Sequence, residues 1–218
     1  MTAIHIKFPA LTLKAGPRAL ARIRQQGLHP REVGTLPGAA GGPKALGIQG
    51  LDLALFGEWL PSAPRERSLI GASVGSWRFA SACLPDAAEG IRRLGQLYNA
   101  QSFAKGVTMA QISQSSRRML EDLLEGRDAS ILDNPHYRLN IMVVKSHGLL
   151  ADDHRGRLGL GLSSVIADNL RGRARLARHF ERLVLHDPRL APPLHTLEDF
   201  PSRFVPCLLY TSPSPRDS

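Results

Sequence analysis

The fold is decided by the stretch Ser68-Leu69-Ile70-Gly71-Ala72-Ser73-Val74-Gly75-Ser76-Trp77-Arg78-Phe79-Ala80. It predicts a short apolar strand, a tight Gly-x-Ser-x-Gly turn and a helix, which is the arrangement of a nucleophile elbow. Gly71 and Gly75 let the backbone turn in a conformation that a Cβ would obstruct. Ser73 is then held at the tip of the turn, where the helix N-terminus favours negative charge. We therefore expect Ser73 to be the catalytic nucleophile.

A second glycine-rich turn, Gly38–Lys44, lies upstream of the first. Glu32–Pro37 predicts a weak strand before it, and an apolar helix is expected after it, from Pro43 to Phe56. The turn does not match a nucleotide-binding loop, because Ala45 follows Lys44 where a Ser or Thr hydroxyl is needed for Mg²⁺. Both glycine turns thus join a strand to a helix.

The two turns together supply the parts of an acyl-transfer site. The N–H groups of Gly41 and Gly42 face the space before a helix N-terminus, where they can hold an anion. The Val74 N–H, next to the serine, adds a third donor to this predicted oxyanion hole. Pro43 cannot donate, since it has no N–H. Lys44 is expected either to support the loop and attract a substrate phosphate, or to be solvated.

Composition indicates one globular domain, and we expect no metal or other cofactor. The chain has 218 residues, of which 43% are hydrophobic and 22% charged, as in ordinary globular proteins. Two distant cysteines, Cys83 and Cys207, form neither a disulfide framework nor a metal-ligand pattern. No apolar run approaches the roughly 20 residues of a membrane span, and the N-terminus lacks the pattern of a secretory signal. We expect a cytoplasmic protein, with peripheral membrane contact as an open alternative.

The net charge of +9 is concentrated in residues 1–31 and 171–182. Such regions attract phosphates of nucleic acids or of anionic lipids, although a solvated basic face has the same composition. We expect no nucleic-acid partner, because aromatic residues make up only 6% of the chain and no zinc-finger or RNP motif is present. The sequence does not indicate an oligomeric state.

Local patterns elsewhere predict further helices and strands, which complete a three-layer α/β/α fold with a mainly parallel sheet. Strands are expected at Ala3–Phe8 and Tyr137–Lys145, helices at Pro17–Gln26 and 75–83, helices capped by Asp86 with Glu89 and by Thr108 with Gln111, a loop at Leu149–Leu158, and a long helix from Ser163 or Ser164 to Leu185. Residues 1–206 are assigned to one hydrolase domain. The Ser/Pro-rich residues 207–218 look like a read-through tail, expected to be disordered and excluded from the fold.

The chain resembles the bacterial patatin-like phospholipases in these two turns. Gly41-Gly42-Pro43-Lys44 matches the family's Gly-Gly-x-Arg/Lys oxyanion loop, and Gly71–Gly75 matches its Gly-x-Ser-x-Gly turn. The surrounding Ala-Gly-Gly-Pro-Lys and Trp-Arg-Phe-Ala sequences are similar to one of its subgroups. The resemblance covers about residues 32–206 and is specific in 38–82. It implies a serine acyl hydrolase that acts on lipid or other carboxylic esters through a Ser-Asp dyad.

The chain departs from the family pattern at three points. Ala40 and Ala45 stand where the family has glycines, and the family's Asp-Gly-Gly/Ala motif is missing from the whole sequence. The dyad aspartate is therefore expected beyond Pro206, which makes the fold incomplete at its C-terminus. Residues 1–206 alone are accordingly expected to turn over little or no ester.

Two alternatives remain from the sequence alone. A Ser-His-Asp α/β-hydrolase would satisfy the chain order of that fold with Ser73, Asp187 and His195. A non-enzymatic protein would bind anionic surfaces through residues 1–31 and 171–182, in a salt-sensitive manner. A histidine ring beside the serine hydroxyl would favour the first, whereas vesicle binding unchanged by Ser73→Ala would favour the second.

Overall fold

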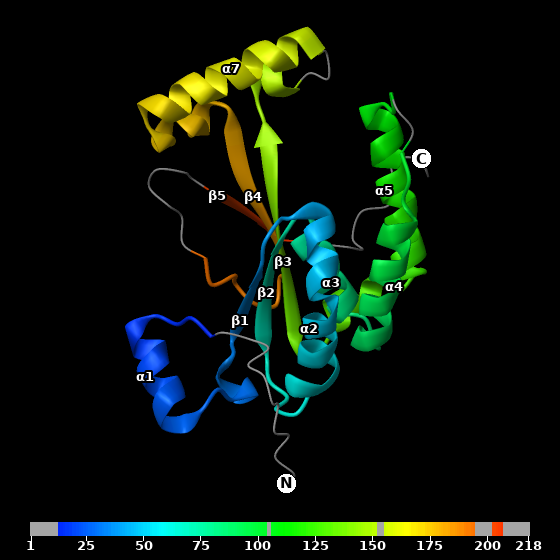
Figure 1. Cartoon of the computed structure of the whole chain (residues 1–218), viewed down its shortest axis with the longest axis vertical. Coiled ribbons are helices and arrows are strands. Elements are labelled where there is room, and N and C mark those ends of the chain that lie inside the picture. Colours follow the sequence, from blue (N-terminus) through cyan, green and yellow to red (C-terminus); the bar gives the residue numbers. More distant parts are fainter. Residues whose placement is uncertain (1–12, 104–105, 152–154, 195–201, 207–218) are drawn as a thin grey trace.

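The structure, a computed structural model, describes residues 13–103, 106–151, 155–194 and 202–206. In this part of the chain the strands form one five-stranded sheet in the order β1-β2-β3-β4-β5, with helices beside it (Figure 1). The elements are α1 (Pro17–Gln26), η1 (Pro30–Glu32), β1 (Thr35–Gly38), η2 (Gly42–Ile48), α2 (Gln49–Ala54), η3 (Leu55–Trp59), β2 (Arg67–Ala72), α3 (Val74–Ala82), α4 (Ala87–Ala100), α5 (Met109–Leu124), α6 (Asp128–Asp133), β3 (Tyr137–Ser146), η4 (Gly148–Ala151), α7 (Arg155–Arg171), η5 (Arg173–Arg178), β4 (Phe180–His186) and β5 (Ser202–Pro206).

The first three strands are parallel and carry the two glycine turns at their carboxyl ends. In the register of β1 and β2, Gly38 lies beside Gly71, so the last residue of β1 is level with the start of the elbow. On the other side of β2, Ala72 lies beside Met142 of β3. Because parallel strands end at the same edge of a sheet, both turns emerge side by side. The α/β class with a mostly parallel sheet is confirmed.

Strand β4 corrects the predicted helix from Ser163 or Ser164 to Leu185. Helix α7 begins earlier and ends at Arg171, next to Gly172 with φ 144°. Residues Phe180–His186 then form β4, antiparallel to β3, with Leu185 beside Ile141. Their apolar side chains, Phe180 and 183–185, suit a strand as well as a helix, and pairing with β3 decides between the two structures. The predicted loop at Leu149–Leu158 is also wrong in part, since η4 and the first turn of α7 lie within it.

Several local predictions are confirmed with their physical cause. Helix α1 has the predicted bounds, with Pro17 at its first position. The Asp86 carboxylate accepts a hydrogen bond from the Glu89 N–H at the start of α4. Thr108 and Gln111 form the capping box of α5. The side-chain caps of α4 and α5 satisfy N–H groups that the first helical turn leaves free, and Pro17 has no N–H to satisfy.

The expected helix at 43–56 is a succession of three helical types. A 3₁₀ segment, η2, leads into the α-helix α2 and then into the π-helical η3. Closely spaced glycines at 42, 47 and 50 lower the α-helix propensity of this run. Phe56 is buried there and meets the Phe79 and Tyr137 rings edge to face, with centroids 5.9 and 5.7 Å away.

Helix α3 packs on β1, β2 and β3, and α4 and α5 lie outside it (Figure 1). The core lies between α3 and the sheet and includes Leu69, Phe79 and Leu139. Within the described ranges no comparable helix packs on the other face of the parallel strands, so the predicted third layer is not seen there. The predicted strand at Ala3–Phe8 and the tail at 207–218 fall outside these ranges. None of the helices described is both long and apolar enough to cross a membrane.

Candidate functional site

Ser73 occupies the tip of a sharp turn between β2 and α3. Its backbone has φ 52° and ψ −127°, a conformation that costs a non-glycine residue on the order of 1–3 kcal/mol. The Ser73 side chain is exposed, while Val74, Gly75 and Ser76 behind it are buried. Val74 is the first residue of α3, so its N–H has no acceptor within the helix. The structure therefore gives the predicted serine the strain and exposure of a nucleophile elbow.

The glycines of the elbow are required by close packing. A Cβ on Gly71 would lie 2.5 Å from the Ser76 Cα, and one on Gly75 would lie 2.1 Å from the Gly38 carbonyl oxygen. The last residue of β1 is equally confined, because a Cβ on Gly38 would lie 2.6 Å from the Phe79 ring. Gly75 and Gly38 thus bring the two turns into direct backbone contact. Gly71 and Gly75 were predicted from the motif, whereas Gly38 was not singled out.

The Gly41–Gly42 loop lies directly beyond this contact. Gly41 precedes η2, and Gly42 has φ 55°, a conformation that glycine adopts without strain. No side-chain atom crowds either residue within 4 Å of its would-be Cβ, and Gly41 is exposed. The loop is therefore open toward a ligand at the same edge of the sheet as Ser73. An oxyanion role for these N–H groups remains a prediction.

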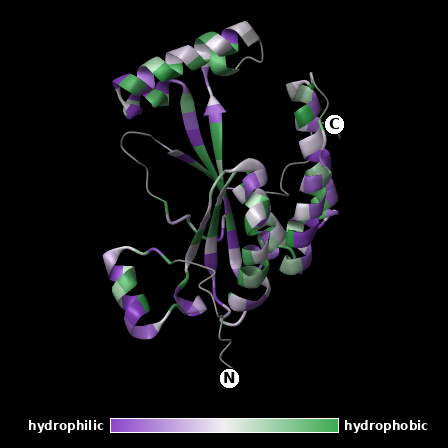
Figure 2. Ribbon diagram, in the orientation of Figure 1, coloured by the Kyte–Doolittle hydropathy of each residue, from purple (hydrophilic) through white to green (hydrophobic). Residues whose placement is uncertain are grey.

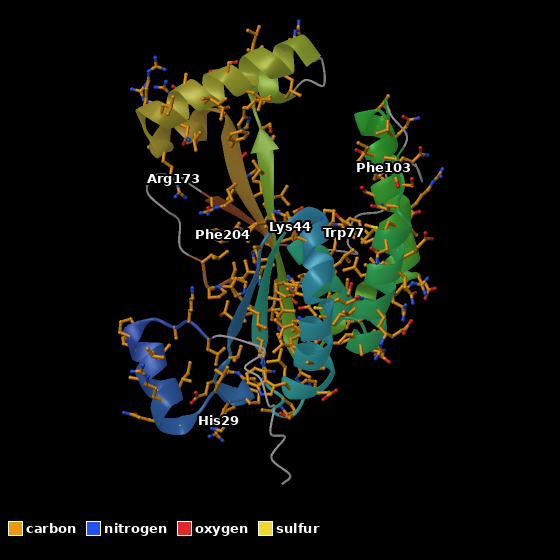
Figure 3. The ribbon with its side chains drawn as sticks, viewed as in Figure 1. His29, Lys44, Trp77, Phe103, Arg173 and Phe204 are labelled. Carbon is orange, nitrogen blue, oxygen red and sulfur yellow. The ribbon has the colours of Figure 1, made fainter. Side chains whose placement is uncertain are left out.

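Lys44 is exposed and follows the loop as the third residue of η2. Its ammonium makes no hydrogen bond or ion pair with any other residue that the structure describes. Figure 3 shows Lys44 near the carboxyl ends of the parallel strands, where Trp77 of α3 also lies. A charge in this position can be used by an anionic group of a ligand, as the sequence predicted, or remain solvated.

A buried ion pair that the sequence did not reveal joins the segments behind the two turns. Arg78 of α3 donates two hydrogen bonds of 2.6 Å to the two carboxylate oxygens of Asp52 on α2. The Asp52 side chain is 3% exposed and the Arg78 side chain 14%. Such a bidentate pair fixes both geometry and distance. The spacing of 26 residues gave no local signal for it.

None of the described residues is positioned as a general base for Ser73. Within the described parts of the chain, no group makes a hydrogen bond to the Ser73 Oγ. Strand geometry places Asp187 on the order of 16 Å from the elbow, because its N–H bonds to Leu139 near the amino end of β3.

There Asp187 is 1% exposed and paired with Arg189, whose guanidinium lies 2.6 Å from its carboxylate. Burial raises the pKa of Asp187, but the hydrogen bonds from Arg189 outweigh it and hold that pKa below its usual value. The structure therefore does not bring Asp187 to Ser73, which removes the proposed Ser73–Asp187–His195 triad. His195 itself lies outside the described residues.

The basic region at 171–182 is divided among three elements. Arg171 ends α7, Arg173–Arg178 form η5, and Arg182 lies in β4. Asp168 accepts a hydrogen bond of 2.9 Å from the His179 ring, which holds the pKa of Asp168 below its usual value. Membrane contact through this region stays a prediction.

Helix α7 has exposed apolar side chains, Leu158, Leu162, Ile166 and Leu170, and Figure 2 shows hydrophobic and hydrophilic residues mixed along it.

Cavities lie at both edges of the sheet. One of about 500 Å³ adjoins the Gly41 loop, and another of about 470 Å³ lies at the opposite edge, near Arg67 and His136. In the described ranges, no three His, Cys, Asp or Glu side chains cluster closely enough to hold a metal ion. Comparisons with protein-family models, with curated proteins and with solved structures found no match to this chain.

Proposed function

We propose that this protein is a serine acyl hydrolase of lipid or other carboxylic esters, in which Ser73 is the nucleophile. The observation that carries the proposal is the Ser73 backbone, strained at φ 52° and ψ −127° between a central parallel strand and a helix. Strain of this kind persists only where the surroundings enforce it, and it clusters at active sites. The close contact of Gly75 with Gly38 supports the proposal, because it is what enforces the turn.

In the proposed reaction the Ser73 Oγ attacks an ester carbonyl and its proton passes to a general base. The tetrahedral oxyanion accepts hydrogen bonds from the N–H groups of Gly41, Gly42 and Val74, and the alcohol leaves with the proton. Water then attacks the acyl-serine, and the same base takes its proton. The resemblance to patatin-like phospholipases makes this base an aspartate, which we do not assign to a described residue.

The test separates acylation of Ser73 from turnover. The protein is incubated with a fluorophosphonate reagent, and the modified serines are mapped and timed by mass spectrometry. Ser62 is the matched control, because it is an exposed serine whose hydroxyl only donates to the Trp59 carbonyl. In serine hydrolases that lack one catalytic group, the oxyanion donors and substrate binding alone still accelerate the reaction about 10³-fold over the reaction in water. We therefore expect Ser73 to react well before Ser62, even if turnover is slow.

Turnover is then followed with p-nitrophenyl butyrate and with phospholipid vesicles. We expect any hydrolysis above background to be lost in Ser73→Ala and kept in Ser62→Ala. Equal labelling of Ser73 and Ser62, or full turnover by Ser73→Ala, would refute the proposed nucleophile.

A further inference from the structure

The cavity beside the Gly41 loop has a volume of about 500 Å³, is open to solvent, and is lined by β1, by the helical run from η2 to η3, and by α3. That volume is within the range of small-molecule sites, which is about 300–1,000 Å³. Its walls are mainly aliphatic and aromatic side chains: Leu36, Ile48, Leu51, Leu55, Phe56 and Phe79. Ile48 and Leu51 are 39% and 36% exposed, so two large apolar side chains of the lining are in contact with solvent.

This cavity shares a wall with the candidate oxyanion loop. Ala39, Ala40 and Gly41 line it. The Ala39 carbonyl oxygen also lies 3.0 Å from where a Cβ on Gly75 would be. One short stretch of backbone therefore adjoins both the cavity and the elbow, and a group held by the Gly41 N–H can extend into the cavity.

The charges around the cavity restrict what can bind in it. Asp52 and Arg78 also line the wall, but they neutralise each other through their bidentate pair. Lys44 is the remaining charged residue of the lining, and it is exposed. An apolar chamber with one cation at its edge suits an aliphatic chain whose carbonyl or anionic end stays near the loop.

We propose that this cavity binds the acyl chain of the ester, and that Leu51 limits the length of chain it accepts. The inference rests on the proposed function for its orientation, with the carbonyl at Gly41 and the chain beneath η2 and α2. It assigns the substrate class as esters of medium or longer aliphatic acids rather than acetyl esters. The binding itself does not depend on Ser73 chemistry and can be measured apart from it.

The experiment introduces a tryptophan into this cavity and, as a control, into a second cavity elsewhere in the structure. Leu51→Trp places an indole at a partly exposed position of the lining, and Leu28→Trp is the matched control. Leu28 is 39% exposed, similar to Leu51, and lines a separate cavity of about 560 Å³ beside α1. The probe is cis-parinaric acid, a fluorescent fatty acid whose emission rises in apolar surroundings. The full chain is titrated as wild type, Leu51→Trp, Leu28→Trp and Ser73→Ala.

We expect wild type, Leu28→Trp and Ser73→Ala to bind the probe alike, and Leu51→Trp to bind it roughly tenfold more weakly or worse. Acylation of Ser73 by p-nitrophenyl octanoate should fall in Leu51→Trp, whereas acylation by the acetate ester should not. Unchanged probe binding and chain-length preference in Leu51→Trp would overturn the cavity assignment and leave Ser73 untouched. If the wild-type protein binds the probe but the fluorophosphonate does not label Ser73, the assignment of Ser73 as nucleophile is refuted and the assignment of the cavity stands.

Discussion

Replacing Gly75 with alanine tests the contact that holds the two turns together. The new Cβ would lie 2.1 Å from the Gly38 carbonyl oxygen, 2.5 Å from the Gly38 carbonyl carbon and 3.0 Å from the Ala39 oxygen. All three atoms belong to the backbone, so no side chain can rotate away. Either the end of β1 or the start of α3 must move by about 0.9 Å or more before the contact becomes tolerable.

The energetic cost follows from that displacement. Inserting a methyl group into a packed site costs about 1–3 kcal/mol, and more where the surroundings cannot yield. Because the Gly38 neighbourhood is confined again by the Phe79 ring, we expect about 3 kcal/mol or more of lost unfolding free energy. In a chain of this size each kcal/mol lowers the melting temperature by about 2–4 °C. Gly75→Ala should therefore melt about 6–12 °C below wild type, and fluorophosphonate labelling of Ser73 should slow.

Thermal unfolding followed by circular dichroism measures the effect, with Gly50→Ala as the control. Gly50 lies in α2 with nothing within 4 Å of its would-be Cβ. Alanine there gains about 0.5–1 kcal/mol of helix propensity, so the control should melt slightly higher than wild type. If Gly75→Ala melted within about 1 °C of wild type, the backbone contact between the elbow and β1 would be disproved.

Three further predictions concern charges and a thiol behind the site. Asp52→Asn should lower the unfolding free energy by about 3–5 kcal/mol, because it leaves the buried Arg78 charge unpaired. A loss of less than about 1 kcal/mol in urea unfolding would contradict this. The double variant with Arg78→Met should recover part of the loss. Asp187 has a pKa held below its usual value by Arg189, so its stabilisation is present above about pH 4 and is lost as pH falls through the lowered pKa. The difference in urea midpoint between wild type and Asp187→Asn should therefore narrow at acid pH, and a constant difference would refute the pairing. Burial raises the pKa of Cys83 to about 12, so iodoacetamide at pH 8 should alkylate it only after unfolding; alkylation in the folded protein, mapped by mass spectrometry, would show that Cys83 is accessible.

Signals that act over a few residues predicted the local structure of this chain. The elbow at Gly71–Gly75, the Asp86 cap and the Thr108 capping box depend on neighbours in sequence, and each is found where expected. Strand β4 was missed because Phe180–His186 fits helical and strand spacing alike, and only pairing with β3 distinguishes them. Pairing partners distant in sequence leave no local pattern.

The same limit applies to the candidate site. The motif predicted Ser73 and its glycines, but the structure alone shows that Gly38 touches Gly75 and that Asp187 lies far from the elbow. Gly38 could have been suspected from its position at the end of β1, where it precedes the glycine loop. Asp187 fitted the chain order of a triad, and chain order carries no information about which edge of the sheet a residue occupies.

Contacts within residues 38–82 join the segments around the two glycine turns. Within the Trp-Arg-Phe-Ala sequence, Arg78 pairs with Asp52 on α2, and Phe79 packs under Gly38 and against Phe56. These four side chains also line the cavity beside the Gly41 loop. They fix the crossover helices to α3, which keeps the Gly41 loop and the strained Ser73 at one edge of two adjacent strands. A site that needs an oxyanion donor and a nucleophile within reach of one carbonyl depends on this shared packing. The residues around both turns therefore form one packed unit, which keeps the two loops at a fixed distance from each other.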